Sequence, residues 1–157
     1  MEDPTQSVIW SETFLGNGNG VVTSGPFANW KTRAGPLIRN VGMMGELMSK
    51  DKINMVLNQT RTQDITYPNG RSGAILEAHS HAVNIWVGGQ MSDLNTAPQD
   101  PVFFNHLAYI DFIWEQFRIR QTQFGINPST DYPNVVENAQ QSPHLRWDLR
   151  IYGTSMD

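Results

Sequence analysis

The chain has 157 residues, of which 39% are hydrophobic and 17% charged; its formal net charge at pH 7 is −4 and it contains no cysteine. A chain of this length can bury a core of its own as a single domain, over residues 1–157. The negative charge gives no electrostatic basis for binding nucleic acid or an anionic membrane, and no apolar run reaches membrane-spanning length. The absence of cysteine excludes disulfides and cysteine-ligated metals.

Residues 1–40 are expected to form a loop-rich segment that wraps the rest of the domain. Glycine and proline punctuate it throughout, with a cluster of turn residues at 16–20. Spaced aromatic side chains usually anchor such a segment to the helices beneath it. We assign that role to Trp10, Phe14, Phe27 and Trp30.

Residues 41–121 are expected to form the helical core, and two short helical patterns open it, over 41–48 and 50–58. Ser49 is suited to cap the second, since a serine hydroxyl accepts a hydrogen bond from a free N–H at a helix start. The apolar face of that helix comprises Ile53, Met55, Val56 and Leu57. Residues 60–73 are polar, contain a Pro-Asn-Gly turn signal, and are expected to be a loop.

A longer helix is predicted from about residue 74 to 87. Leu76, Glu77 and Ala78 favour a helix, and two glycines directly after residue 87 are typical of a helix end. A strand is the alternative, because five residues alternate as on one strand face: His79, His81, Val83, Ile85 and Val87. The strand would place two histidines on one face, where they could form a weak zinc or copper site.

The strongest helical pattern runs from about residue 101 to 121. Asp100 is a good N-cap, and Pro101 suits the first helical position because its missing N–H has no intrahelical acceptor there. Apolar and histidine side chains then recur every three or four residues: Phe103, His106, Leu107, Ile110, Trp114 and Phe117. After this helix, residues 122–157 are expected to be an extended tail with a short strand at 146–152, and His144 receives no role.

Several stretches closely resemble the second copper-binding (CuB) region of tyrosinases, the type-3 copper phenol oxidases related to molluscan haemocyanins. Residues 85–91 read Ile-Trp-Val-Gly-Gly-Gln-Met, residues 97–104 read Ala-Pro-Gln-Asp-Pro-Val-Phe-Phe, and residues 108–114 read Ala-Tyr-Ile-Asp-Phe-Ile-Trp. Upstream, residues 7–10, 14–16 and 25–30 are similar to the segment that joins the two copper regions. The resemblance implies a mainly α fold: half of a four-helix bundle, with core helices at about 74–87 and 101–121.

In that family three imidazoles hold the second copper. Two lie four residues apart on one helix, before the Trp-Val-Gly-Gly run, so both face the same ion. The third is the second histidine of a pair on the next helix. The resemblance places these ligands at Ser80, Asn84 and Leu107, and His106 at the first, non-ligand place of the pair.

Histidines also lie near the substituted positions. His79 and His81 flank the first ligand position, and a step of one residue turns a helical side chain by roughly 100°. A hydroxyl, an amide and an isobutyl group cannot replace imidazoles for copper. We therefore expect no metal cofactor and regard the histidines as residues that bond to their neighbours; a metal, if bound, would use His79, His81 and His106.

The resemblance begins after the first copper region of the family, and no histidine precedes Gly73. Half a bundle would leave an apolar helical face uncovered. We therefore expect another protein chain, either a complementary tyrosinase-like half or a second copy, to cover the helices at 74–87 and 101–121. Neither nucleic acid nor a membrane is expected as a partner.

The leading functional hypothesis is a non-catalytic tyrosinase-like domain with a structural or protein-interaction role in an extracellular assembly. Asn58 begins a glycosylation sequon, which would be meaningful in a secreted protein. The alternative is one part of a copper-dependent phenol or catechol oxidase whose other copper half lies on another chain or was removed. Copper would be the cofactor in that alternative.

Overall fold

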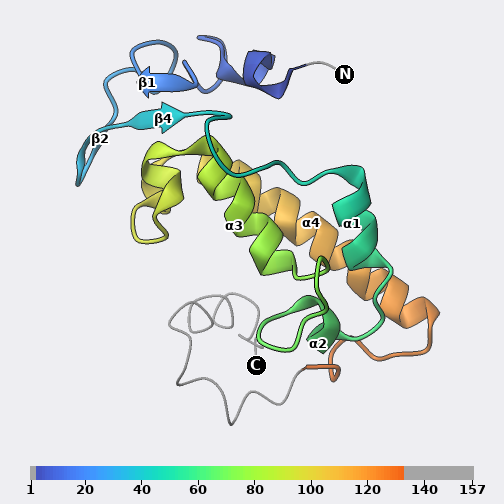
Figure 1. Ribbon diagram of the computed structural model, residues 1–157. Helices are drawn as coiled ribbons and strands as arrows, with labels where there is room; N and C mark the ends of the chain where they lie inside the picture. The colour runs from blue at the N-terminus through green and yellow to red at the C-terminus, as the bar shows by residue number, and fades with distance from the viewer. Residues whose placement is uncertain (1–2, 133–157) are drawn as a thin grey trace.

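The protein is described here by a computed structural model that covers residues 3–132 (Figure 1). The expected strand at 146–152, most of the expected tail and His144 lie outside this range. Within it the chain is mainly helical, as expected. The elements in order are η1 Pro4–Gln6, η2 Val8–Trp10, β1 Asn19–Val21, β2 Lys31–Thr32, β3 Gly35–Pro36, β4 Ile38–Asn40, α1 Lys50–Leu57, α2 Thr62–Ile65, α3 Leu76–Val87, η3 Gly89–Ser92, η4 Ala97–Gln99 and α4 Val102–Gln123.

The two long helices, α3 and α4, lie side by side, and α1 packs along α4 (Figure 1). The N-terminal segment lies over one end of this helical layer and contains two small antiparallel sheets, β1 with β4 and β2 with β3. In register, Gly20 lies opposite Arg39 and Lys31 opposite Pro36. No helix in residues 3–132 combines the length and apolar character needed to cross a membrane.

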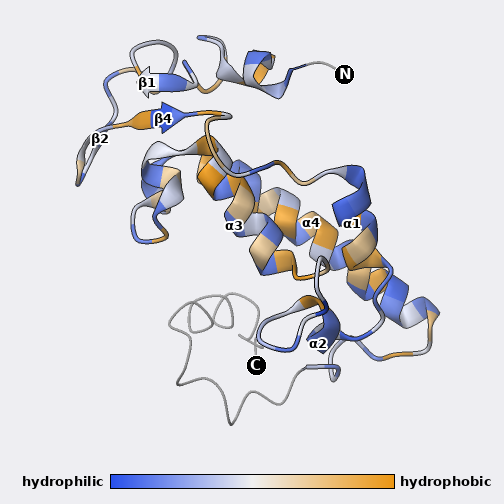
Figure 2. Cartoon of the chain, in the orientation of Figure 1, coloured by the Kyte–Doolittle hydropathy of each residue, from blue (hydrophilic) through white to orange (hydrophobic). Residues whose placement is uncertain are grey.

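Two apolar clusters form the core. The first joins α1, α2, α3 and α4 and consists of Val56, Ile65, Leu76, Ile110, Ile113 and Phe117. The second lies under the N-terminal segment and consists of Leu15, Val87, Met91, Ala97 and Val102. Figure 2 shows hydrophobic residues along α3 and α4, interspersed with hydrophilic ones. Burial of these side chains away from water is the main force that holds the layers together.

The prediction of α4 is confirmed, with its end two residues further along at Gln123. Asp100 does cap it, since its Oδ1 accepts a hydrogen bond from the backbone N–H of Val102 at 3.0 Å. Pro101 has helical angles and precedes the first assigned helical residue. The α1 prediction is also confirmed, with the Ser49 hydroxyl accepting from the N–H of Lys52 at 3.3 Å.

The residues of α3 form a helix, so the strand alternative for this segment is wrong. The helix ends where expected, because β4 crosses its C-terminus closely. A Cβ atom added at Gly89 would lie 1.8 Å from the backbone oxygen of Ile38, and φ at this glycine is +54°. A residue with a side chain could therefore not occupy position 89 without moving β4.

The helix expected at 41–48 is wrong: these residues form turns and bends. The segment instead runs along α3, with the N–H of Gly42 donating to the carbonyl of Trp86 at 2.9 Å. Gly45 has a positive φ of 68° and lies so close to α3 that an added Cβ would be 2.5 Å from the carbonyl oxygen of Ala82. The expected loop at 60–73 contains the short helix α2, whose first N–H, at Thr62, is capped by the distant Asp131 at 2.8 Å.

Of the four expected aromatic anchors, three hold the N-terminal segment in place. Trp10 packs against Trp86 of α3 with ring centroids 6.3 Å apart, and Phe27 packs on the second apolar cluster. Trp30 is 45% exposed, but its indole N–H donates to the carbonyl of Gln99 at 3.1 Å, just before α4. Phe14 is 51% exposed, so its assignment as an anchor is wrong. Spacing alone does not distinguish an aromatic that packs inward from one that faces solvent.

Candidate functional site

The positions that the resemblance assigns to the family's copper ligands lie on α3 and α4. Ser80 and Asn84 are one helical turn apart on α3, and Leu107 lies near the start of α4. Asn84 is buried, while Ser80 and Leu107 are half-buried. The amide oxygen of Asn84 has no hydrogen-bond partner among residues 3–132.

Ser80 is linked to His106, the residue that precedes Leu107 on α4. Its hydroxyl oxygen is hydrogen-bonded to Nε2 of His106, 2.9 Å away, and this bond links α3 to α4. His106 belongs to the buried stripe of α4 that also contains Ile110, Ile113 and Phe117. Burial lowers the pKa of His106 below its usual value of 6.5, so this ring is neutral at pH 7.

Two more histidines lie on α3, and their side chains point in other directions. His79 is buried, and its Nε2 donates to the carbonyl oxygen of Gly73 at 2.9 Å. Donation to a carbonyl places a proton on Nε2. His81 is exposed on the opposite side of the helix. Because each step along a helix rotates the side chain by roughly 100°, these two histidines point in different directions.

These residues do not fit a copper ion held by three imidazoles. Copper prefers nitrogen and sulfur donors, whereas the equivalent positions offer a hydroxyl, an amide and an alkyl group. The imidazole nearest to them, His106, is already bonded to Ser80. Residues 3–132 contain no group of three histidine or acidic side chains placed to hold a metal ion.

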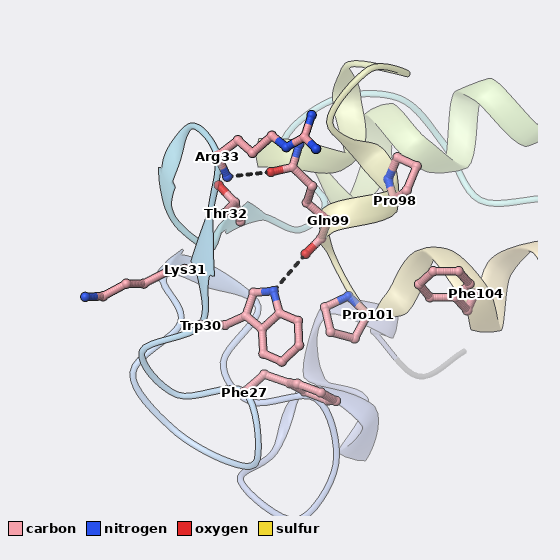
Figure 3. A pocket seen from close by; sticks show the side chains of 9 residues that line it. All are labelled: Phe27, Trp30, Lys31, Thr32, Arg33, Pro98, Gln99, Pro101 and Phe104. Atoms are coloured by element: carbon pink, nitrogen blue, oxygen red, sulfur yellow. Dashed lines mark hydrogen bonds between the residues drawn. The ribbon is translucent and has the colours of Figure 1, made fainter.

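A second feature, a surface pocket of about 400 Å³, was not predicted from the sequence (Figure 3). It lies between the β2–β3 hairpin, η4 and the first turn of α4. Three aromatic residues and two prolines supply most of its lining: Phe27, Trp30, Phe104, Pro98 and Pro101. The exposed Trp30 and Phe104 are the residues from which it could have been suspected, but their proximity depends on the tertiary structure.

Comparisons with known proteins agree with the resemblance read from the sequence. Residues 1–120 match the profile described as the common central domain of tyrosinase. The chain is 35% identical to "Tyrosinase-like protein 2" of Margaritifera margaritifera over 153 residues, which cover 85% of this chain and 34% of that protein. It is 31% identical to "Putative tyrosinase-like protein tyr-3" of Caenorhabditis elegans, over 93% of this chain and 22% of that protein.

A bacterial relative matches over a larger share of its own length. The chain is 31% identical to the tyrosinase of Streptomyces antibioticus, over 85% of this chain and 56% of that protein. The chain therefore spans between about a fifth and a little over half of the length of these relatives. The profile match covers well over half of the chain, and the chain belongs to the tyrosinase family.

Proposed function

We propose that this chain is a non-catalytic tyrosinase-like domain with a structural or protein-interaction role in an extracellular assembly. The observation that carries the proposal is the bond between Ser80 and His106, next to the positions that the resemblance assigns to the ligands of the second copper. Dioxygen chemistry in type-3 proteins needs copper, and the residues at these positions cannot hold it through imidazoles. The domain would then be retained for its fold and its surfaces.

An exposed apolar stripe on α4 supports an interaction role. Ala108, Phe112 and Ile119 are exposed and, at roughly 100° per residue, lie within about 40° of arc on the helix, with the exposed Glu115 beside them. Phe112 is 56% exposed and Ile119 45%. Tyr109 stacks on Phe112 and extends the stripe, with ring centroids 6.3 Å apart. Apolar side chains gathered on one exposed helix face are typical of a surface that another protein covers.

The occupant that we propose for this stripe is a complementary tyrosinase-like segment. The relatives carry additional sequence beyond the matched part, amounting to 44% of the Streptomyces antibioticus protein and more of the molluscan and nematode proteins. In a helical bundle the outer face of one helix pair is covered by another pair. A second copy of this chain is the competing occupant, and the association test below distinguishes the two.

The extracellular setting draws its support from Asn58. This asparagine lies at the C-terminus of α1 and is exposed, so an enzyme could reach its side chain. Its amide oxygen accepts a long hydrogen bond of 3.4 Å from Arg120, which is weak enough to be replaced. Glycan attachment at this place would not disturb the core.

Metal analysis of the purified full chain tests the absence of copper chemistry. The chain and the Streptomyces antibioticus tyrosinase would be loaded with copper in separate samples and dialysed in parallel. Each would then be assayed for bound copper and for oxidation of a diphenol. We expect the tyrosinase to retain copper and to oxidise the substrate, and this chain to do neither. Stoichiometric copper together with diphenol oxidation would overturn the proposal and establish the alternative, a part of a copper-dependent phenol oxidase.

Light scattering coupled to gel filtration tests the association. The chain would be measured alone and after mixing with the separately expressed first-copper half of the Streptomyces antibioticus tyrosinase. Formation of a mixed complex supports the proposed occupant. A dimer of this chain would assign the stripe to a second copy. A chain that stays monomeric and does not bind the added half at micromolar concentration would contradict the interaction role.

A further inference from the structure

The pocket beside the start of α4 is built from apolar surfaces that are held in place before any ligand arrives. Gln99 of η4 fixes two of its walls: its backbone carbonyl accepts from the indole N–H of Trp30 at 3.1 Å, and its side-chain oxygen accepts from the backbone N–H of Arg33 at 2.7 Å (Figure 3). Because the indole N–H is occupied, Trp30 offers its ring face to a ligand. Preorganised surfaces of this kind lower the entropic cost of binding.

Ring surfaces dominate the floor of the pocket. Trp30 packs edge-on against Phe27 with centroids 5.7 Å apart, and Pro101 lies between Trp30 and Phe104 in Figure 3. Phe104 is 61% exposed and Trp30 45%, so both remain available to a partner. Grooves lined by aromatic rings are the surfaces on which extended proline-rich segments dock, because such segments are already in the polyproline II conformation.

The rim of the pocket is positively charged. Lys31 and Arg33 are exposed, extend to different sides of Trp30 in Figure 3, and form no salt bridge with any residue from 3 to 132. The chain as a whole carries a net charge of −4, so two unpaired cations beside one apolar pocket form a local exception. They favour a ligand that carries carboxylates next to its apolar rings.

We propose that this pocket binds an extended, acidic, proline-containing segment of a partner protein. Proline rings would pack on Trp30 and Phe104, and carboxylates would pair with Arg33 and Lys31. The pocket is open to solvent, so a small molecule would leave much of its surface in water, whereas a peptide continues its contacts beyond the pocket. The inference goes beyond the proposed function and does not depend on it, because no residue of the pocket occupies a copper-ligand position.

A peptide titration of the full chain tests this inference. The probe is an acetylated and amidated peptide of sequence Glu-Pro-Pro-Glu-Pro-Pro, followed by calorimetry and by the amide and indole resonances of the labelled protein. We expect saturable binding that shifts the indole resonance of Trp30. A peptide with lysine in place of glutamate, and one with alanine in place of proline, are each expected to bind more weakly.

Matched variants locate the binding. Phe104→Ala is expected to weaken binding roughly fivefold or more, and Arg33→Gln roughly two- to fivefold. Phe124→Ala removes an aromatic ring of nearly equal exposure, 58%, at the far end of α4, and Lys50→Gln removes an unrelated surface charge. Neither control should change the affinity.

The inference is overturned if the acidic peptide does not bind, if the lysine peptide binds as well, or if Phe104→Ala and Arg33→Gln bind like the controls. None of these variants replaces a buried side chain, so each is expected to fold. A spectrum of dispersed amide resonances for each variant verifies this before the titration.

Discussion

Arg39 of β4 and Asp100 before α4 form an ion pair in which both side chains are completely buried. The contact is bidentate, with Nε to Oδ2 at 2.8 Å and Nη2 to Oδ1 at 2.7 Å. Arg39 also donates to the carbonyl of Leu15 at 2.7 Å and lies over the Trp10 ring. One guanidinium therefore joins the N-terminal segment, β4 and the start of α4.

Removal of either partner of this pair should strongly destabilise the fold. Arg39→Met or Asp100→Asn leaves an uncompensated buried group and is expected to lower the free energy of unfolding by roughly 3–5 kcal/mol. The exposed pair of Arg118 and Glu115 serves as the control, since Arg118→Gln should cost about 1 kcal/mol or less. Urea denaturation followed by tryptophan fluorescence measures both, and equal effects would contradict the structural role assigned to Arg39.

The stability of the domain should depend on pH through His106. Burial lowers the pKa of this ring in the folded chain, whereas the unfolded chain takes up the proton near the usual value of 6.5. Between these two pKa values the unfolded state binds more protons, so the free energy of unfolding falls as the pH falls from about 6.5 through the folded pKa. His106→Gln should reduce the dependence of the free energy of unfolding on pH, whereas the exposed His81→Gln should not. Urea denaturation midpoints measured between pH 7 and pH 5 test this difference. An identical pH dependence in the two variants would refute the prediction.

Three histidines at the positions that the resemblance assigns to copper ligands should create a metal site. In Ser80→His/Asn84→His/Leu107→His, two imidazoles share one face of α3 and a third approaches from α4, so about one copper ion per chain is expected. The triple alanine variant at the same positions removes the same polar groups without adding a ligand and is the control. Copper retained after dialysis is the measurement, and equal copper in both variants would show that these positions do not converge.

The apolar stripe of α4 should matter for association and not for folding. Phe112→Ser and Ile119→Ser are expected to weaken the mixed complex described above while changing the free energy of unfolding by less than about 1 kcal/mol, because both side chains are largely exposed. Phe117→Ala removes a fully buried ring of the same helix and should cost roughly 3–5 kcal/mol. Undiminished complex formation by both serine variants would place the partner elsewhere.

Glycosylation at Asn58 can be tested by secretion from a eukaryotic host. We expect a mass increase that is removed by a glycosidase and is absent in Asn58→Gln, because the side chain is exposed at the end of α1. Thr60→Ala, which destroys the sequon but keeps the asparagine, should lose the modification as well. A secreted chain of unmodified mass would refute the assignment.

Local signals were sufficient to predict the regular helices. Ser49 and Asp100 supply the caps that begin α1 and α4, and two glycines end α3, so these bounds follow from neighbouring residues in the sequence. The turns at 41–48 could not be predicted in this way. Their hydrogen bonds go to the backbone of α3, and tertiary contacts of this kind override a short helical pattern.

The candidate site was predictable only within each helix. Ser80 and Asn84 fall on one face of α3 by spacing alone, but the contact of Ser80 with His106 depends on how α3 and α4 are rotated against each other. The same limit applies to Arg39 with Asp100, which are distant in sequence and meet only in the folded chain. The pocket likewise combines residues from the hairpin, η4 and α4.

The hydrogen bond between Ser80 and His106 also bears on how metal ligands could be introduced at these positions one at a time. Ser80→His alone would insert a ring where a hydroxyl now fits and leave His106 buried without its partner, a loss of about 1–3 kcal/mol. No compensating ion could bind until the other two imidazoles were present. Ser80→His alone is therefore expected to be less stable than the present sequence without gaining a bound metal.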